Sequence, residues 1–200
     1  LRLSQRQRFL RDVKALAGSD VRVLWTPRYT DLTVIYDELG QAITWDGAPA
    51  TRITAQGKGY IQAFNGTTEF GSMADSPAQS FGNSAVDRPF SGVVFANVTD
   101  TALARVLCAK ADGGVSAFEW SFNIGTTDVL QFQVGDQSAA VFPSRGSNSA
   151  ITKGSPRVFA FSYSAATGGA TAMNDVILYQ DGAEIASTAT NNALYVAMEN

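Results

Sequence analysis

Residues 118–123, with the sequence FEWSFN, alternate aromatic and polar side chains, and residues 129–134, VLQFQV, alternate in the same way. Successive side chains of a β-strand point to opposite faces of the sheet, so this period of two predicts strands with one apolar face. Antiparallel sheets commonly bury one face and leave the other in solvent. The two runs therefore predict half-buried antiparallel strands. Their core-facing residues are Phe118, Trp120, Phe122, Leu130, Phe132 and Val134.

From Val21 onward, short β-rich runs are separated by Gly, Pro, Asn and Asp. This spacing is typical of a sandwich or barrel, and with the alternating strands it predicts an all-β fold, an antiparallel β-sandwich, as a single domain over residues 19–200. The candidate strands are 21–26, 32–36, 41–45, 51–54, 60–64, 91–98, 104–109, 116–123, 129–134, 139–142, 157–163, 175–180 and 183–187. Two polar stretches, 71–90 and 143–156, are predicted to be long surface loops.

Residues 4–17 show helical periodicity, with Ser4 placed to cap the helix and Gly18 placed to end it. Residues 1–18 are thus predicted to be a helical arm with five basic residues and one aspartate, whereas residues 15–200 carry a net charge of −7. A basic helix of this kind favours docking to an acidic partner or to another copy of the acidic body. The candidate partner-binding residues are Arg6, Arg8, Leu10, Arg11, Val13 and Leu16. The alternative is a helix folded back onto its own sandwich with its charges solvated.

Composition excludes several kinds of chemistry. The 200 residues include no histidine and one cysteine, so a histidine-activated nucleophile, a histidine base and the usual transition-metal sites are excluded. Cys108 lies in an apolar run and is expected to be a small buried hydrophobe. Charged residues make up 16% of the chain and the net charge is −3, which argues against nucleic acid and favours sugars or neighbouring subunits as partners. The sequence shows no membrane span and no apolar signal-peptide core, so a soluble protein without classical secretion is expected.

Seven segments between residues 60 and 187 occur in the order found in laminin G-like jelly rolls of the concanavalin A-like superfamily. Residues 63–70 (AFNGTTEF) resemble the first strand of that family, and residues 175–182 (DVILYQDG) resemble its strand that leads into an Asp-Gly hairpin turn. The other segments that resemble family strands are Phe90–Val98, Arg105–Lys110, Ala117–Gly125, Val129–Gly135 and Val158–Tyr163.

This resemblance implies that a final strand closes the sandwich after a segment like Ala193–Glu199, so the C-terminal edge is expected to be incomplete. Proteins that join this module to a short helical arm, without a signal peptide or paired cysteines, resemble virion proteins of tailed bacteriophages. The implied function is a virion-surface structural, capsid-decoration or tail-associated protein, made in the host cytoplasm. Its implied partners are other virion proteins or further copies of the chain in a homo-oligomer. The alternative is a carbohydrate-binding, lectin-like module for cell-surface glycans.

The enzymatic branch of the superfamily uses a Glu-x-Asp-x-x-Glu run on one strand, because alternation turns the first two carboxylates into the cleft. Glu119 is the one carboxylate within a strongly predicted strand, and positions 117 and 121 are not acidic. We therefore expect a protein without hydrolase activity.

Carbohydrate binding requires exposed aromatic rings beside polar side chains. The strand aromatics Trp120, Tyr163 and Tyr179 are in phase with other apolar residues, which favours core packing over sugar binding. The candidate glycan-binding residues are Phe81, Asn83 and Trp45.

Calcium is the one metal that the composition favours, through Asp and Asn side chains at turns. The candidate ligands are Asp112, Asp128 and Asp175. The alternative is that these aspartates accept hydrogen bonds within their own turns. No other cofactor is expected.

Overall fold

The computed structural model describes residues 11–12, 15, 34–36, 41–47, 50–53, 60–65, 67–99, 104–111 and 118–199. The chain divides into two compact units, Leu1–Ala78 and Gln79–Asn200. The sequence prediction placed its division after residue 18 instead. Arg11, Asp12 and Ala15 are α-helical and exposed, at positions within the predicted helix, and the rest of that helix lies outside the described residues, as does the candidate strand 21–26.

The first unit contains two small antiparallel sheets. One has the strand order β1-β2-β5, with β1 Val34–Tyr36, β2 Ala42–Asp46 and β5 Phe70–Ser72. The other pairs β3 Ala50–Ile53 with β4 Tyr60–Ala63. In the first sheet Gly71 lies opposite Trp45, and a Cβ at Gly71 would come within 2.4 Å of the indole ring. Glycine is therefore required there, because the ring occupies the space of a side chain.

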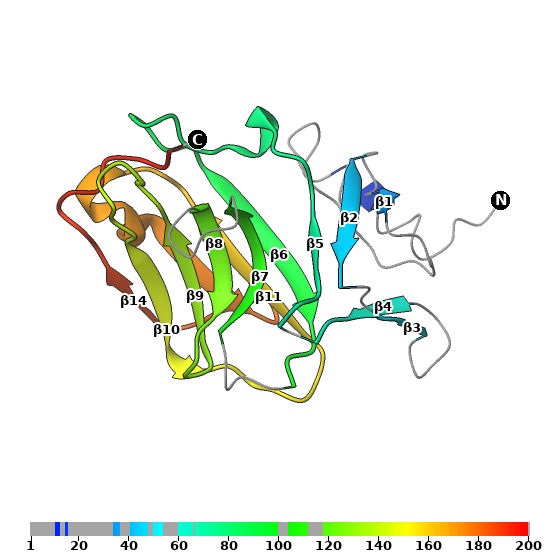
Figure 1. Ribbon diagram of the computed structural model, residues 1–200. Helices are drawn as coiled ribbons and strands as arrows, with labels where there is room; N and C mark the ends of the chain where they lie inside the picture. Colours follow the sequence, from blue (N-terminus) through cyan, green and yellow to red (C-terminus); the bar gives the residue numbers. More distant parts are fainter. Residues whose placement is uncertain are drawn as a thin grey trace. The chain divides into compact units, whose positions relative to one another are not determined.

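The second unit is a sandwich of two antiparallel sheets, visible as two layers in Figure 1. The five-stranded sheet has the order β14-β10-β9-β8-β7, with β7 Arg105–Ala111, β8 Phe118–Ile124, β9 Val129–Val134, β10 Ser144–Ala150 and β14 Ser187–Thr190. The four-stranded sheet has the order β13-β12-β11-β6, with β6 Phe90–Ala96, β11 Arg157–Tyr163, β12 Val176–Gln180 and β13 Ala183–Glu184. The second unit also contains the 3₁₀ segment η3 Gly169–Asp175, and another 3₁₀ segment, η2 Pro77–Gln79, spans the boundary between the two units along the chain.

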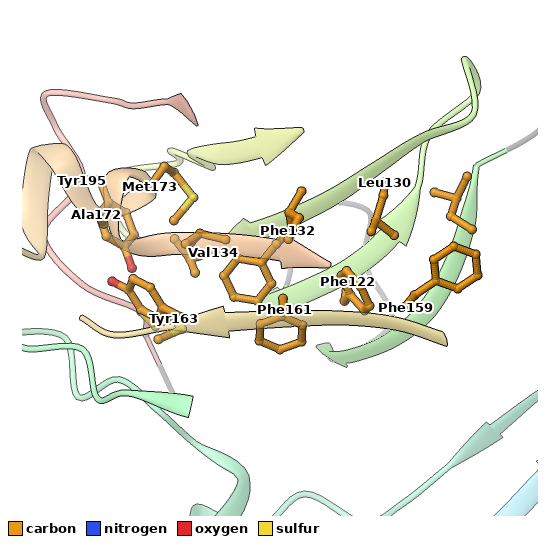
Figure 2. Packing of buried hydrophobic residues seen from close by; sticks show 14 of the residues in the cluster. Phe122, Leu130, Phe132, Val134, Phe159, Phe161, Tyr163, Ala172, Met173 and Tyr195 are labelled. Carbon is orange, nitrogen blue, oxygen red and sulfur yellow. The ribbon is translucent and has the colours of Figure 1, made fainter. Parts of the chain in front are cut away.

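The core of the second unit lies between its two sheets. Phe132 of β9 stacks on Phe161 of β11 with ring centroids 4.4 Å apart, and Phe122 of β8 lies 5.0 Å from the same ring. Figure 2 shows these side chains converging from both layers. Burial of one such side chain contributes about 1.5–3 kcal/mol to folding. The prediction of an all-β antiparallel sandwich is therefore confirmed.

The inward-facing predictions for β8 and β9 hold, because Phe122, Leu130, Phe132 and Val134 are fully buried and Phe118 and Trp120 are half-buried. The prediction that the opposite face of β8 is solvated is wrong. Glu119, Ser121 and Asn123 are at most 8% exposed. Asn123 Nδ2 donates hydrogen bonds to Ser121 Oγ and to Gln133 Oε1, both at 3.1 Å. Buried polar groups are tolerated when they are hydrogen-bonded in this way.

The predicted loop 143–156 is wrong over its first half, which forms β10. This strand pairs with β9 on one side and β14 on the other, so backbone hydrogen bonds hold it although its side chains are polar. A register shift lies between Gly146 and Ala150, and beside it Ser147 Oγ accepts a hydrogen bond from Leu130 N at 3.0 Å. The candidate strand 139–142 is instead a turn closed by a single bridge between Asp136 and Val141. Residues 73–89 are largely irregular, as predicted for 71–90.

Candidate functional site

The N-terminal arm contributes one described residue to the predicted partner-binding set. Arg11 is exposed, and its Nε and Nη2 donate to Asp12 Oδ1 at 2.9 and 2.7 Å. The charge of Arg11 is thus locally balanced by its neighbour. The remaining candidates, Arg6, Arg8, Leu10, Val13 and Leu16, lie outside the described residues.

The three candidate glycan-binding residues do not share one unit. Phe81 and Asn83 belong to the second unit, where the Phe81 ring stacks on Phe90 with centroids 4.0 Å apart and packs against the core. Asn83 Oδ1 accepts hydrogen bonds from the amides of residues 85 and 86 and so caps a turn. Trp45 belongs to the first unit and meets the edge of Phe64 at 5.7 Å, with Phe64 44% exposed. Of the three, Trp45 is the one with an exposed aromatic neighbour.

The two described calcium candidates have other polar partners. Asp128 Oδ2 lies 2.6 Å from Lys153 Nζ. Asp175 Oδ2 accepts hydrogen bonds from Thr167 N, Thr167 Oγ1 and Gly168 N at 2.6, 3.0 and 3.2 Å. The contacts of Asp175 are hydrogen bonds within its own loop, which was the alternative to calcium, whereas the contact of Asp128 is an ion pair with Lys153. Asp112 lies outside the described residues, and within those described no three His, Cys, Asp or Glu side chains gather as a metal site.

Glu119 of β8 is 2% exposed and anchors a loop. Its Oε1 accepts hydrogen bonds from the amides of Phe81 and Gly82, and its Oε2 lies 3.1 Å from Lys110 Nζ. Lys110 also donates to the hydroxyl of Ser80. The carboxylate is therefore enclosed between the amides of Phe81 and Gly82 and the ammonium group of Lys110 on β7. This arrangement holds a loop against the sheet and leaves no room for a substrate at Glu119.

Asp87 is a buried carboxylate that the sequence prediction did not single out. Its Oδ2 accepts hydrogen bonds from the hydroxyls of Tyr163 and Tyr195 at 2.5 and 2.8 Å, and its Oδ1 accepts one from Met198 N at 2.7 Å. Figure 2 shows the two tyrosine hydroxyls pointing toward each other. Burial, together with the negative charge of Asp87, raises the pKa of both tyrosines, so both stay protonated donors at neutral pH. The signal in the sequence was a tyrosine in phase with the core, because a buried phenol requires a hydrogen-bond partner.

Residues 195–199, which follow β14, do not form a strand but are held to the rest of the sandwich by hydrogen bonds. Val196 N donates to Asp136 Oδ2 at 3.2 Å, Glu199 N donates to Gly135 O at 3.3 Å, and Ser84 N donates to Met198 O at 3.0 Å. A Cβ at position 82 would lie 2.2 Å from Met198 O, so glycine is needed there for the close approach. Residues 195–199 are therefore part of the folded body of the second unit.

Cys108 of β7 packs against the core, as expected for a small hydrophobe. Burial raises the pKa of its thiol to about 12. The thiolate is the reactive form, so a raised pKa disfavours reaction of this side chain at neutral pH.

The outer face of the four-stranded sheet in the second unit carries exposed apolar side chains. Registers place Val93 beside Ala160 and Ala160 beside Tyr179, and they place Phe95 beside Val158. We call this set the outer apolar face. It consists of Val93, Phe95, Val158, Ala160, Ile177 and Tyr179. Val93 and Phe95, both on β6, are 70% and 67% exposed. Val158, Ala160, Ile177 and Tyr179 are half-buried, and a partly exposed apolar patch of this kind is typical of an interaction surface.

No protein family, curated protein or solved structure matches the chain. No described helix has the length and apolar character needed to cross a membrane.

Proposed function

We propose that this protein is a non-catalytic structural component of a bacteriophage virion surface, either a decoration or a tail-associated protein, built on a laminin G-like jelly roll. The observation that carries the proposal is the outer apolar face, because Val93 and Phe95 lie in solvent on a sheet edge where an assembly partner can cover them.

The strand order supports the jelly-roll part of the proposal. The segments that resemble laminin G-like strands coincide with β6, β7, β8, β9, β11 and β12 in the same order. The segment 63–70 differs, because most of it forms a turn in which Asn65 Oδ1 accepts hydrogen bonds from the amides of residues 67–69. The resemblance therefore lies mainly in the second unit.

The environment of Glu119 supports a non-catalytic role. A glycoside hydrolase needs two carboxyl groups that face the sugar across a cleft. Glu119 instead faces Lys110 and two backbone amides, and it is almost completely buried. Its charge is paired with Lys110 within the fold, and this pairing supports the proposed non-catalytic role.

The basic arm is the proposed attachment to the virion, because its charge is opposite to that of an acidic partner surface. Immunogold electron microscopy of particles made by the genome that encodes this chain tests the proposal. Labelling on the particle surface supports it, and protein found only free of particles overturns it.

A chain that begins at Ser19 should lose particle association and keep its thermal stability. If the arm folds back onto its own sandwich, the same deletion lowers thermal stability and leaves association unchanged.

Glycan binding is the second candidate, and the partly exposed pair of Trp45 and Phe64 favours it, because sugars stack on exposed aromatic rings. A glycan array probed with the full chain tests this role. Binding that disappears in Trp45→Ala and persists in Trp120→Phe supports a lectin function through the first unit. Absence of binding to every glycan on the array argues against it.

A further inference from the structure

We propose that two copies of this chain pair edge to edge through β6, which joins their four-stranded sheets into one eight-stranded antiparallel sheet. This inference rests on the proposed role in an assembly and names the first partner, a second copy of the chain. Among the described residues, β6 has one hydrogen-bonded neighbour, β11, and forms the rim of its sheet in Figure 1. Its other edge presents a row of backbone donors and acceptors that a further strand can use.

The four edges of the sandwich differ in how well they resist such pairing. Natural edge strands are protected by being short, charged or interrupted by bulges. β13 has two residues and β14 has four, while β7 carries Arg105 and Lys110 and has two register shifts against β8. β6 has seven residues, FSGVVFA, without charge or proline, and its register with β11 is continuous. It is the one edge of the described sandwich without these protections.

The sequence of β6 fits a two-fold axis. In the joined sheet, residues on the outer face of one β6 must lie opposite residues on the outer face of the other. A shift of the register by one residue would pair outer-face residues of one copy with core-facing residues of the other. Antiparallel pairing about Val93 satisfies this condition and uses all seven residues. It places Val93 opposite its own copy, and it places Ser91 opposite Phe95 in both halves of the interface. Such a self-complementary patch defines a closed dimer rather than an open chain.

Charge favours a second copy over a charged partner. A two-fold axis brings each charged residue of a strand close to its own copy, and like charges directly opposite are destabilising. β6 has no charge, so self-pairing avoids this cost although the chain has a net charge of −3. Near the Phe95 end, Arg157 Nη1 lies 2.7 Å from Asp181 Oδ2, so the neighbouring charges are already paired within each copy. The outer apolar faces of the two copies then become continuous.

Disulfide crosslinking of the full chain tests the register. Directly opposite residues in antiparallel strands have Cα atoms about 4.5–5.5 Å apart, within the range for a disulfide. Val93→Cys, in a Cys108→Ala background, should form a covalent dimer under mild oxidation. Val106→Cys is the matched control, because Val106 is 66% exposed on β7, the edge of the other sheet. A mixture of Ser91→Cys and Phe95→Cys should crosslink, whereas Ser91→Cys alone should not, because its two copies lie about 13 Å apart.

Sedimentation velocity of the full chain tests the association itself. The unmodified protein should form a dimer of twice 21.2 kDa as its concentration rises, and Phe95→Lys should weaken the dimer at least tenfold. Val106→Lys should leave it unchanged. Equal crosslinking of Val93→Cys and Val106→Cys would overturn the proposal, as would a chain that stays monomeric at all concentrations. Val93→Cys that resists both crosslinking and maleimide would also overturn it, by showing that another part of the same chain covers β6.

The two proposals fail separately. A monomeric chain that still labels virions overturns the β6 dimer and leaves the virion role standing. A dimer that crosslinks through Val93→Cys but is absent from particles overturns the virion role and leaves the dimer.

Discussion

The two outer faces of the sandwich invert the usual pattern of burial. On the five-stranded sheet, the outward-pointing Glu119, Ser121 and Asn123 are at most 8% exposed, whereas on the four-stranded sheet Val93 and Phe95 are at least 67% exposed. Polar groups can be buried at low cost when each has a partner, and apolar groups can be exposed without harm to folding. The first face therefore contributes to the stability of one copy. The second face contributes to association in the proposed dimer.

Substitutions on the two faces should therefore affect different measured quantities. Substitutions on the polar face should change the free energy of unfolding of the monomer. Substitutions on the apolar face should change association and leave that free energy nearly constant. The expected effects below run from the largest to the smallest.

Glu119→Ala should destabilise the protein by about 3–5 kcal/mol, because it leaves Lys110 partly buried without its counter-charge and two loop amides without an acceptor. Urea unfolding followed by tryptophan fluorescence measures the change. Glu184→Ala, an exposed carboxylate on β13, should change stability by less than about 0.5 kcal/mol. The double variant Glu119→Leu with Lys110→Met should recover only the part of the loss that comes from the unpaired Lys110, since apolar residues can replace a buried ion pair but accept no hydrogen bond from the two amides. A loss below about 1 kcal/mol in Glu119→Ala would contradict a stabilising role for this face.

Tyr195→Phe should cost about 1.5–3 kcal/mol, the usual range for a hydrogen bond to a charged group. The substitution keeps the ring and removes one of the three donors to Asp87. Tyr179→Phe, on the outer apolar face, is the matched control and should have little effect. Equal effects of the two changes in urea unfolding would show that the Asp87 cluster adds no stability.

The core of the sandwich could be predicted because it follows the period of two. Phe122, Leu130 and Phe132 alternate with polar residues, and the strands that contain them were located within a few residues. β10 could not be predicted by this rule, because its sequence SRGSNSA has no apolar alternation and its backbone is held by neighbours on both sides. The alternation of apolar and polar residues indicates which face of a strand is buried. A strand with polar side chains on both faces, held by a neighbour on each side, therefore cannot be detected from this alternation.

The candidate sites were harder to predict than the fold. Phe81 lies in a polar loop, which suggested an exposed ring, but the loop is drawn onto Glu119 and the ring stacks on Phe90. Asp87 lies in the same loop and gave no local signal, because its partners are 76 and 108 residues away in the sequence. Single-sequence patterns report local periodicity, whereas these roles depend on tertiary contacts.

Alkaline pH should lower the free energy of unfolding through the buried hydroxyls of Tyr163 and Tyr195 and the buried thiol of Cys108. The pKa values of Tyr163 and Tyr195 are raised in the folded state, and that of Cys108 is raised from 9.0 to about 12. Above the pKa of the unfolded groups, the unfolded chain loses protons that the folded chain keeps, so the free energy of unfolding falls with rising pH. The contribution of these groups to the free energy of unfolding is thus fully present below about pH 9. Above that pH it declines by up to about 1.4 kcal/mol per pH unit for each group. Urea unfolding between pH 8 and 11 measures the slope, which should be shallower in Tyr195→Phe. An identical slope in both proteins would contradict this cause.

The smallest expected effect gives the sharpest test of the two faces. Phe95 and Phe161 lie on adjacent strands of one sheet and point to opposite sides, with Phe95 67% exposed and Phe161 2% exposed. Phe161→Ala should cost about 3–5 kcal/mol, because it opens a cavity in the core. Phe95→Ala should change the free energy of unfolding by less than about 0.5 kcal/mol at protein concentrations where the chain is monomeric. At higher concentrations it should reduce only the stability gained by pairing, which follows mass action. A loss above about 1 kcal/mol for Phe95→Ala in the monomer would mean that Phe95 is covered within a single copy, and the inversion between the two faces would not exist.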